Sequence, residues 1–236
     1  HETFGSQVTW NAEYGFELRP GTSIYTVAGT AFRAPDATDR YGYGGNPALD
    51  PERSRSLELG LRHRIDGGHS LSLGVFRNDL DDLIQFVVTD MDTYEGENRN
   101  VERARIEGIE ASWDYEGALW RARAAVTLQD PRDLSNDTRL LRRADENYTL
   151  ALARRIGAHE VALDALVAGD RLDFGFPSAV RLGGYTVVNL SGRFAVTRAL
   201  GLTARLENVF DRDYELARGY NTMGRSLFVA ARYDFR

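Results

Sequence analysis

The sequence predicts an all-β protein, an antiparallel up-and-down transmembrane β-barrel of about eleven strands. Three observations lead to this fold class. Polar and apolar residues alternate along most of the chain, short and long connections follow one another in turn, and aromatic residues lie near one end of several strands. Each observation is typical of strands that show one face to lipid and the other to water.

The alternation defines the individual strands. In the third segment, Leu57, Leu59 and Leu61 lie on one face and Glu58 and Arg62 on the other. The same period of two predicts strands at residues 7–17, 21–33, 53–65, 69–88, 101–115, 118–129, 143–156, 159–171, 184–196, 200–208 and 225–235. Helical periodicity is nearly absent, so we expect no substantial helix.

The connections are of two kinds. Tight turns with Gly or Pro, such as Asp66-Gly67-Gly68 and Glu116-Gly117, alternate with long segments. The long segments are residues 34–52, 89–100, 130–142, 172–183 and 209–224. All long loops therefore lie at one end of the sheet. Outer-membrane barrels have this arrangement, with long loops extracellular and tight turns periplasmic, whereas a soluble β-sandwich mixes loop lengths at both ends.

Charged side chains occupy the polar face of the strands. They are Glu58, Arg62, Glu110, Arg121, Arg123, Asp164, Arg205, Glu207 and Arg232. Unpaired charges are costly in a dry core but cost little beside water, so this face is expected to border a wet lumen. Tyr14, Trp113, Trp120 and Tyr233 lie near the tight turns, where a membrane barrel has an interfacial aromatic belt.

Composition excludes several classes of protein. A net charge of -6 argues against nucleic-acid binding, and the absence of cysteine excludes disulfides and thiolate sites. The acidic groups around Asp79 and Asp90 match no known cation loop, so we expect neither a metal nor a cofactor. Apart from the terminal His1, the histidines lie beside tight turns, away from the long loops. No general base is therefore available there, and we expect no enzyme.

The long loops hold the candidate ligand-binding residues. Rings beside amide groups suit a large, partly apolar solute. The candidates are Tyr41, Tyr43, Asn46, Tyr94, Asn136, Phe174, Phe176, Tyr220 and Asn221. The alternative for each is that it packs one loop against another, and for Asn46-Pro47 a structural role in directing the loop into its strand is favoured.

Four segments, in order along the chain, resemble the TonB-dependent receptors of the bacterial outer membrane. They are Asn46–Ser54 (NPALDPERS, preceded by Arg33-Ala34-Pro35), Phe76–Ile84 (FRNDLDDLI), Ala104–Glu110 (ARIEGIE) and Leu206–Tyr214 (LENVFDRDY). Arg77-Asn78-Asp79, Leu140–Ala144 (LLRRA) and Gly219-Tyr220 with Gly224-Arg225 resemble the cobalamin receptors of that family, although siderophore receptors share most of these residues.

The resemblance implies energy-coupled uptake of a scarce solute, with cobalamin the first choice and a ferric siderophore the alternative. Such receptors have about twenty-two strands and an N-terminal plug domain. Residues 1–236 are therefore expected to form the C-terminal half of the barrel, without the plug. The implied partners are outer-membrane lipid, the N-terminal half with its plug, the TonB protein acting through that plug, and a small-molecule ligand.

An isolated half barrel would leave two open sheet edges, and unpaired backbone groups are costly in lipid. The missing N-terminal half could complete the barrel, the eleven strands could close on themselves, or several copies could assemble; we favour the first. Passive porins and soluble β-sandwich binding modules are the alternatives from other classes.

Overall fold

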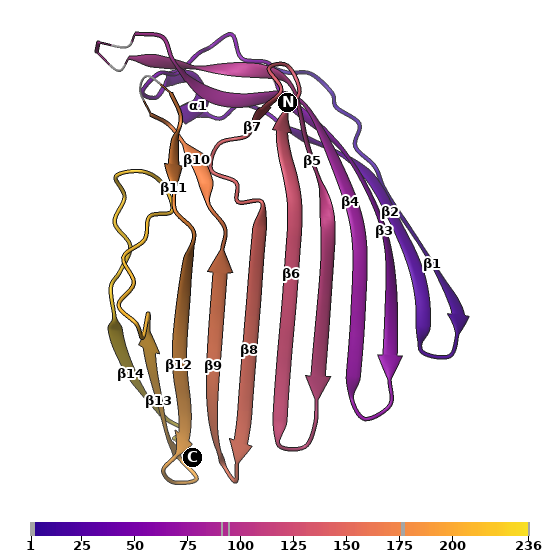
Figure 1. Cartoon of the computed structure of the whole chain (residues 1–236), viewed down its shortest axis with the longest axis vertical. Coiled ribbons are helices and arrows are strands. Elements are labelled where there is room, and N and C mark those ends of the chain that lie inside the picture. Colours follow the sequence, from indigo (N-terminus) through magenta and orange to yellow (C-terminus); the bar gives the residue numbers. More distant parts are fainter. Residues whose placement is uncertain (1–2, 91, 94, 176–177, 236) are drawn as a thin grey trace.

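The computed structural model describes residues 3–90, 92–93, 95–175 and 178–235, apart from the side chains of residues 101 and 102. Eleven long strands follow one another in an antiparallel sheet (Figure 1). They are β1 (Asn11–Arg19), β2 (Thr22–Arg33), β3 (Glu52–Ile65), β4 (His69–Val88), β5 (Gly96–Glu116), β6 (Trp120–Asp133), β8 (Glu146–Ile156), β9 (His159–Ala168), β12 (Tyr185–Ala195), β13 (Leu200–Glu207) and β14 (Ser226–Tyr233). The predicted all-β, up-and-down architecture is confirmed.

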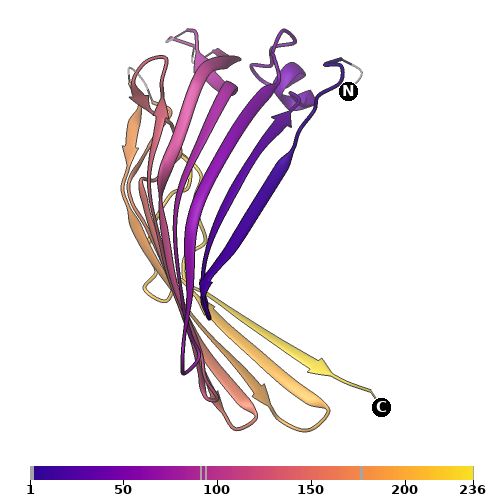
Figure 2. The same cartoon turned by 90° about the vertical axis from the view of Figure 1, so that its right-hand side faces the viewer.

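The long connections gather at one end of the sheet and the tight turns at the other (Figure 1). Small elements lie within the long connections. A short helix, α1 (Ala37–Tyr41), follows β2, the strand β7 (Thr138–Arg139) pairs with β6, and β10 (Arg171–Asp173) forms a hairpin with β11 (Val180–Leu182). Figure 2 shows that the sheet is strongly twisted and curved. Strand β1 and strand β14 each keep one edge that pairs with no described strand, so the sheet is not closed.

Some predicted boundaries were wrong. The first strand was expected from residue 7, but regular pairing begins at Asn11, although Trp10 still exchanges hydrogen bonds with Thr30. The connection expected at residues 89–100 is shorter, because β5 already begins at Gly96 and pairs with the end of β4. The strand expected at 159–171 ends at Ala168, and Arg171 belongs to the hairpin in the loop.

The pairing register joins apolar residues of neighbouring strands into continuous rows. One row contains Phe16, Ile24, Leu61, Leu73, Ala111, Val126, Tyr148 and Val167, each directly opposite the next. Because residues directly opposite share a face, these side chains form one surface, here called the apolar face. Leu59 and Leu73 on this face are 54% and 50% exposed, so the described chain does not cover it.

The opposite surface of the sheet, here called the ionic face, is held together by polar contacts. The Tyr25 hydroxyl donates to Glu58 Oε1 at 2.6 Å, and the Arg62 guanidinium lies over the Tyr25 ring, 4.1 Å from its centroid. Glu160 accepts from Arg121 at 2.5 Å and from Arg193 at 3.2 Å, linking β6, β9 and β12. The predicted segregation of charge from apolar residues is therefore present in the middle of the sheet, whereas toward the long loops the apolar face also carries charges such as Arg77 and Arg105.

Buried side chains lie at the loop end of the molecule. One small core contains Leu83, Ala104 and Leu140, and another contains Ala168, Tyr185 and Val187 with Tyr214 packed against them. Between the loops and the tight turns the sheet is a single layer (Figure 2). In the described residues no helix is long and apolar enough to cross a membrane.

Candidate functional site: the long-loop end

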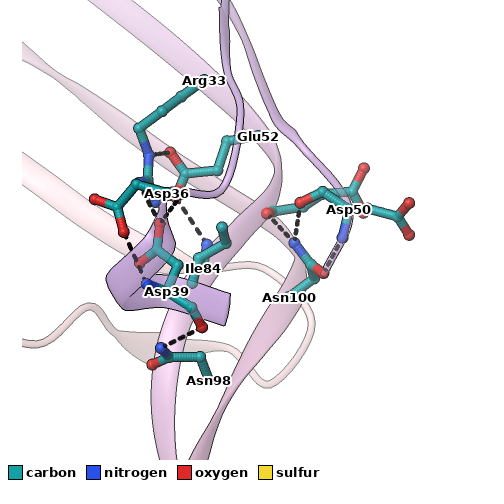
Figure 3. Close-up of polar contacts among 9 residues, drawn as sticks. Arg33, Asp36, Asp39, Asp50, Glu52, Ile84, Asn98 and Asn100 are labelled. Atoms are coloured by element: carbon teal, nitrogen blue, oxygen red, sulfur yellow. Dashed lines mark hydrogen bonds and ion pairs between the residues drawn. The ribbon is translucent and has the colours of Figure 1, made fainter. Parts of the chain in front are cut away.

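The connection between β2 and β3 begins with a capped helix and an ion-pair cluster (Figure 3). Asp36 accepts from the Asp39 backbone N–H at 2.8 Å, and Asp39 Oδ2 accepts from the Asp36 N–H at 3.0 Å, so each end of this capping box satisfies the other. Arg33 donates to Asp39 at 2.8 Å and to both oxygens of Glu52 at 2.6 and 2.8 Å. Glu52 also accepts from the Ile84 N–H at 2.8 Å, which ties this connection to β4.

Asparagine side chains fasten the same connection to the β4–β5 hairpin. Asn98 donates to the Asp39 carbonyl at 3.0 Å, and Asn100 donates to the Asp50 carbonyl at 2.9 Å (Figure 3). Asn46 donates to the Asn98 carbonyl at 3.1 Å and accepts from the Ala48 N–H at 2.9 Å. Asn46 thus has a structural role in the described loop, as favoured from the sequence.

An aromatic group joins three of the loop regions. The Tyr43 and Phe86 rings stack with centroids 5.9 Å apart, and the Phe86 and Phe174 rings meet edge to face at 6.0 Å. The Arg142 guanidinium lies 5.1 Å from the centroid of the Phe174 ring. These four residues, here called the aromatic bridge, come from the loop after β2, from β4, and from the connections after β6 and β9. The bridge combines apolar surface with one fixed cation.

Asp173 fixes the position of the aromatic bridge. Its carboxylate is fully buried and accepts from Arg142 Nε at 2.7 Å, from the Phe174 N–H at 2.7 Å and from the Arg218 N–H at 2.6 Å. Burial raises the pKa of a carboxyl group, but these three donors outweigh it and hold the pKa of Asp173 below its usual value. One ionised side chain therefore connects three of the long loops.

The neighbouring loops are held by Arg171 and two tyrosines. Arg171 is buried, donates to the carbonyl oxygens of Glu215 and Leu216, and lies 5.2 Å from the centroid of the Tyr185 ring. The Tyr185 and Tyr214 rings stack at 4.3 Å. The connection between β13 and β14 therefore folds back against β10 and β12.

The segment LENVFDRDY closes β13 with side-chain hydrogen bonds. Asn208 has a positive φ of 48° and is buried. Its amide donates to the Arg212 carbonyl at 2.9 Å and accepts from the Arg212 N–H at 2.8 Å. Asp211 accepts from the Arg225 N–H at 2.7 Å. These contacts give the segment a structural role and place no reactive group in it.

The candidate ligand-binding residues fall into several groups. Tyr43 and Phe174 are brought together through Phe86, whereas Tyr41 and Tyr220 are exposed on separate loops. Asn136 donates to Asp133 at 3.0 Å within its own turn, and Asn221 forms a backbone bridge with Glu215. Tyr94 and Phe176 lie outside the described residues. A role in ligand binding stays a prediction for all nine.

Three residues of this site were missed in the sequence. Phe86 reads as an ordinary strand aromatic, and Arg142 lies in a string noted only for its resemblance to a family. Asp173 carries a weak signal, since it stands between Leu172 and Phe174 in a loop and is expected to be either exposed or paired. Its partners are 31 and 45 residues away in sequence, so local spacing could not reveal them.

Residues 1–209 match the family model "TonB dependent receptor-like, beta-barrel". The chain belongs to this family. A curated relative, the vitamin B12 transporter BtuB of Vibrio vulnificus (strain YJ016), is 32% identical over 238 residues, covering 98% of this chain and 38% of the relative. The chain thus spans well under half the length of that relative.

Solved structures of similar fold include the copper transporter OprC, with a TM-score of 0.79 and 22% identity over 95% of this chain and 40% of that one. The siderophore receptor PirA from Acinetobacter baumannii has a TM-score of 0.77 and 18% identity, covering 96% of this chain and 41% of PirA. At these identities the likeness supports the fold alone.

Proposed function

We propose that this chain is the C-terminal part of the barrel of an outer-membrane receptor that takes up cobalamin by energy coupling through TonB. The observation that carries the proposal is the 32% identity to a vitamin B12 transporter over 98% of the chain. A ferric siderophore is the second candidate substrate, because siderophore receptors such as PirA have the same fold.

The two faces of the sheet support the proposal that it forms part of the wall of a barrel. The apolar face carries no covering layer and suits contact with acyl chains, while the ionic face suits a wet interior. A plug domain placed against the ionic face would meet ion pairs such as that of Arg121 with Glu160. The side chains of this pair are partly exposed, so the plug could form further hydrogen bonds with them. The N-terminal half of the barrel would pair with the open edges of β1 and β14.

The long-loop end supports ligand capture on the extracellular side. The aromatic bridge offers ring surface and one guanidinium, held in place by the buried Asp173. A large solute with an apolar body and polar substituents could contact both kinds of group. Nothing in this arrangement supplies a nucleophile with a base, so the proposed role is binding and passage, without bond chemistry.

Uptake of labelled cobalamin by cells that lack their own receptor tests the proposal. The full-length gene product should restore uptake only when TonB is present. Phe174→Ala should reduce binding at low ligand concentration, whereas Phe210→Ala, which changes an exposed aromatic of another loop, should leave it unchanged. Restored uptake of a ferric siderophore without cobalamin would select the alternative, and uptake independent of TonB would indicate a passive pore.

A further inference from the structure

The apolar face ends in arginine-rich rows on strands β3 to β6. Beyond the apolar row of Leu59, Val75, Ile109 and Leu128, the next row toward the long loops is Leu57, Arg77, Glu107 and Asp130, so charge begins at this step on β4, β5 and β6. On the same face strands β3 to β6 carry six arginines, here called the arginine rows: Arg53, Arg55, Arg77, Arg103, Arg105 and Arg132. The register is unbroken through these strands, so the arginines continue the apolar face directly.

The distance from apolar to charged surface is short. Successive positions on one face of a strand are two residues apart, which is about 6.6 Å. Arg77 follows Val75 by one such step, and Arg105 follows Ile109 by two. A lipid with its acyl chains on Val75 and Ile109 would therefore have its head group beside these guanidinium groups.

Like charges lie directly opposite one another in these rows. Arg105 of β5 pairs with Arg132 of β6, and Arg132 pairs with Arg139 of β7. Three cations in adjacent strands repel one another, which is unfavourable in a sheet unless an anion lies among them. Carboxylates lie beside each of them: Asp79 accepts from Arg105 at 2.7 Å and Asp130 accepts from Arg132 at 2.7 Å. Arg139 pairs with Asp145 at 2.7 Å and with Asp170 at 3.3 Å.

The arginine rows keep capacity for a further anion. On the same face four acids accompany the six arginines: Asp79, Asp81, Glu107 and Asp130. Six cations less four anions leave this surface with a charge of +2, although the whole chain has a net charge of -6. Among the described side chains, Arg53 and Arg103 have no ion-pair partner. The side chain of Arg55 is 68% exposed although it pairs with Asp81. Exposed pairs of this kind contribute little, so a phosphate can replace them at small cost.

The chemistry of the side chains indicates the kind of anion. The 29 basic side chains of the protein are all arginines, whose planar guanidinium binds phosphate through two parallel hydrogen bonds. Strands β8, β9 and β12 do not reach the level of the arginine rows, because β8 begins at Glu146, opposite Leu128, β9 ends at Ala168 and β12 begins at Tyr185. The arginine rows are therefore confined to strands β3 to β6, with Arg139 of β7 beside them.

We propose that the arginine rows bind the phosphate groups of a phosphorylated glycolipid in the outer leaflet, with its acyl chains on the adjoining apolar face. This inference rests on the proposed function, because it needs the long-loop end to face outward. A fixed glycolipid there would stabilise strands β3 to β6 beneath the loops of the aromatic bridge. The ligand is a lipid, and free phosphate lacks the acyl part that the apolar face would hold.

The test uses the purified full-length receptor in detergent, titrated with lipid A, with dephosphorylated lipid A and with inorganic pyrophosphate. The test compares two double variants, Arg103→Gln with Arg132→Gln and Arg53→Gln with Arg55→Gln. The fold should tolerate both, because Arg55 and Arg132 belong to exposed ion pairs and the other two arginines have no ion-pair partner among the described side chains. Arg154→Gln is the matched control, since Arg154 lies on the same face, opposite Trp120 at the tight-turn end.

We expect each double variant to weaken lipid A binding by about tenfold, with no change for Arg154→Gln. Dephosphorylated lipid A should bind weakly to all variants, and pyrophosphate should compete poorly. Equal binding of both lipids, equal binding by the double variants, or tight binding of pyrophosphate would overturn the inference. Cobalamin uptake measured on the same variants separates the two proposals. Failure of uptake with lipid A binding intact would count against the proposed function alone, and loss of the expected lipid A binding with uptake intact would count against this inference alone.

Discussion

Replacing Asp173 with alanine should release three of the long loops at once. The substitution removes the partner of Arg142 and leaves two backbone N–H groups, those of Phe174 and Arg218, without an acceptor. A buried donor without a partner costs about 1–3 kcal/mol. The Arg142 side chain is 48% exposed and can find water, so the ion pair itself contributes less than a buried pair does.

Together these losses come to about 3 kcal/mol of local stability. Since 1.4 kcal/mol is about a factor of ten, the released state of the loops should become roughly a hundred times more populated. A ligand that binds only the assembled loops would lose apparent affinity in the same proportion once the released state dominates. The strands themselves should be unaffected, because their hydrogen bonds do not involve Asp173.

Amide hydrogen exchange in the full-length receptor measures this directly. Protection should fall in residues 140–145, 171–175, 178–182 and 209–224 and stay unchanged in β4, β5 and β6. Asp173→Asn, which retains one acceptor oxygen but no charge, should have an intermediate effect. Asp213→Ala is the matched control, because Asp213 is exposed and lies in the connection between β13 and β14 that Asp173 holds through Arg218. Unchanged loop protection in Asp173→Ala would refute the role given to this carboxylate.

Three further perturbations follow from the same contacts. Because the pKa of Asp173 is lowered on folding, its stabilisation is present above the unfolded value of about 3.9 and is lost as pH falls toward and through the folded value. The protection factors of the loop amides, which correct for the pH dependence of the intrinsic exchange rate, should be constant from pH 7 to about 5 and fall at lower pH; a fall already near pH 6 would contradict this. Gly60→Val should displace the Tyr25 ring, because a Cβ at residue 60 would overlap it, and lower the unfolding temperature of the receptor, whereas Gly183→Ala, at an open loop position without a positive φ, should cost little. Leu73→Arg on the apolar face should destabilise the barrel in membranes by about 2–4 kcal/mol, while Ser72→Arg on the ionic face should have a small effect; equal costs in a denaturant titration would count against the two-faced sheet.

Much of the fold could be predicted because a single period of two dictates it. In β4, Leu71, Leu73 and Val75 must share a face whatever their partners are, and the tight turn at Asp66-Gly67-Gly68 fixes which strand comes next. The alternation of turn lengths then places every long loop at one end. These are local signals, and strand pairing between sequence neighbours preserves them.

The arrangement of the loops could not be predicted in the same way. The hairpin of β10 and β11 is three residues per strand, too short for a periodic pattern. Phe86 and Phe174 are 88 positions apart in the sequence and meet only because the sheet carries both loops to the same end. The arginine rows likewise need the register, since Arg105 and Arg132 become neighbours through pairing.

The central claim is that alternate residues of each strand face lipid and water. Because this chain has no cysteine, single cysteines at residues 71–76 of β4 can carry nitroxide labels in the full-length receptor in membranes. Labels at 71, 73 and 75 should be relaxed mainly by oxygen, and labels at 72, 74 and 76 mainly by a water-soluble nickel chelate. A uniform or reversed pattern along these six positions would contradict the account.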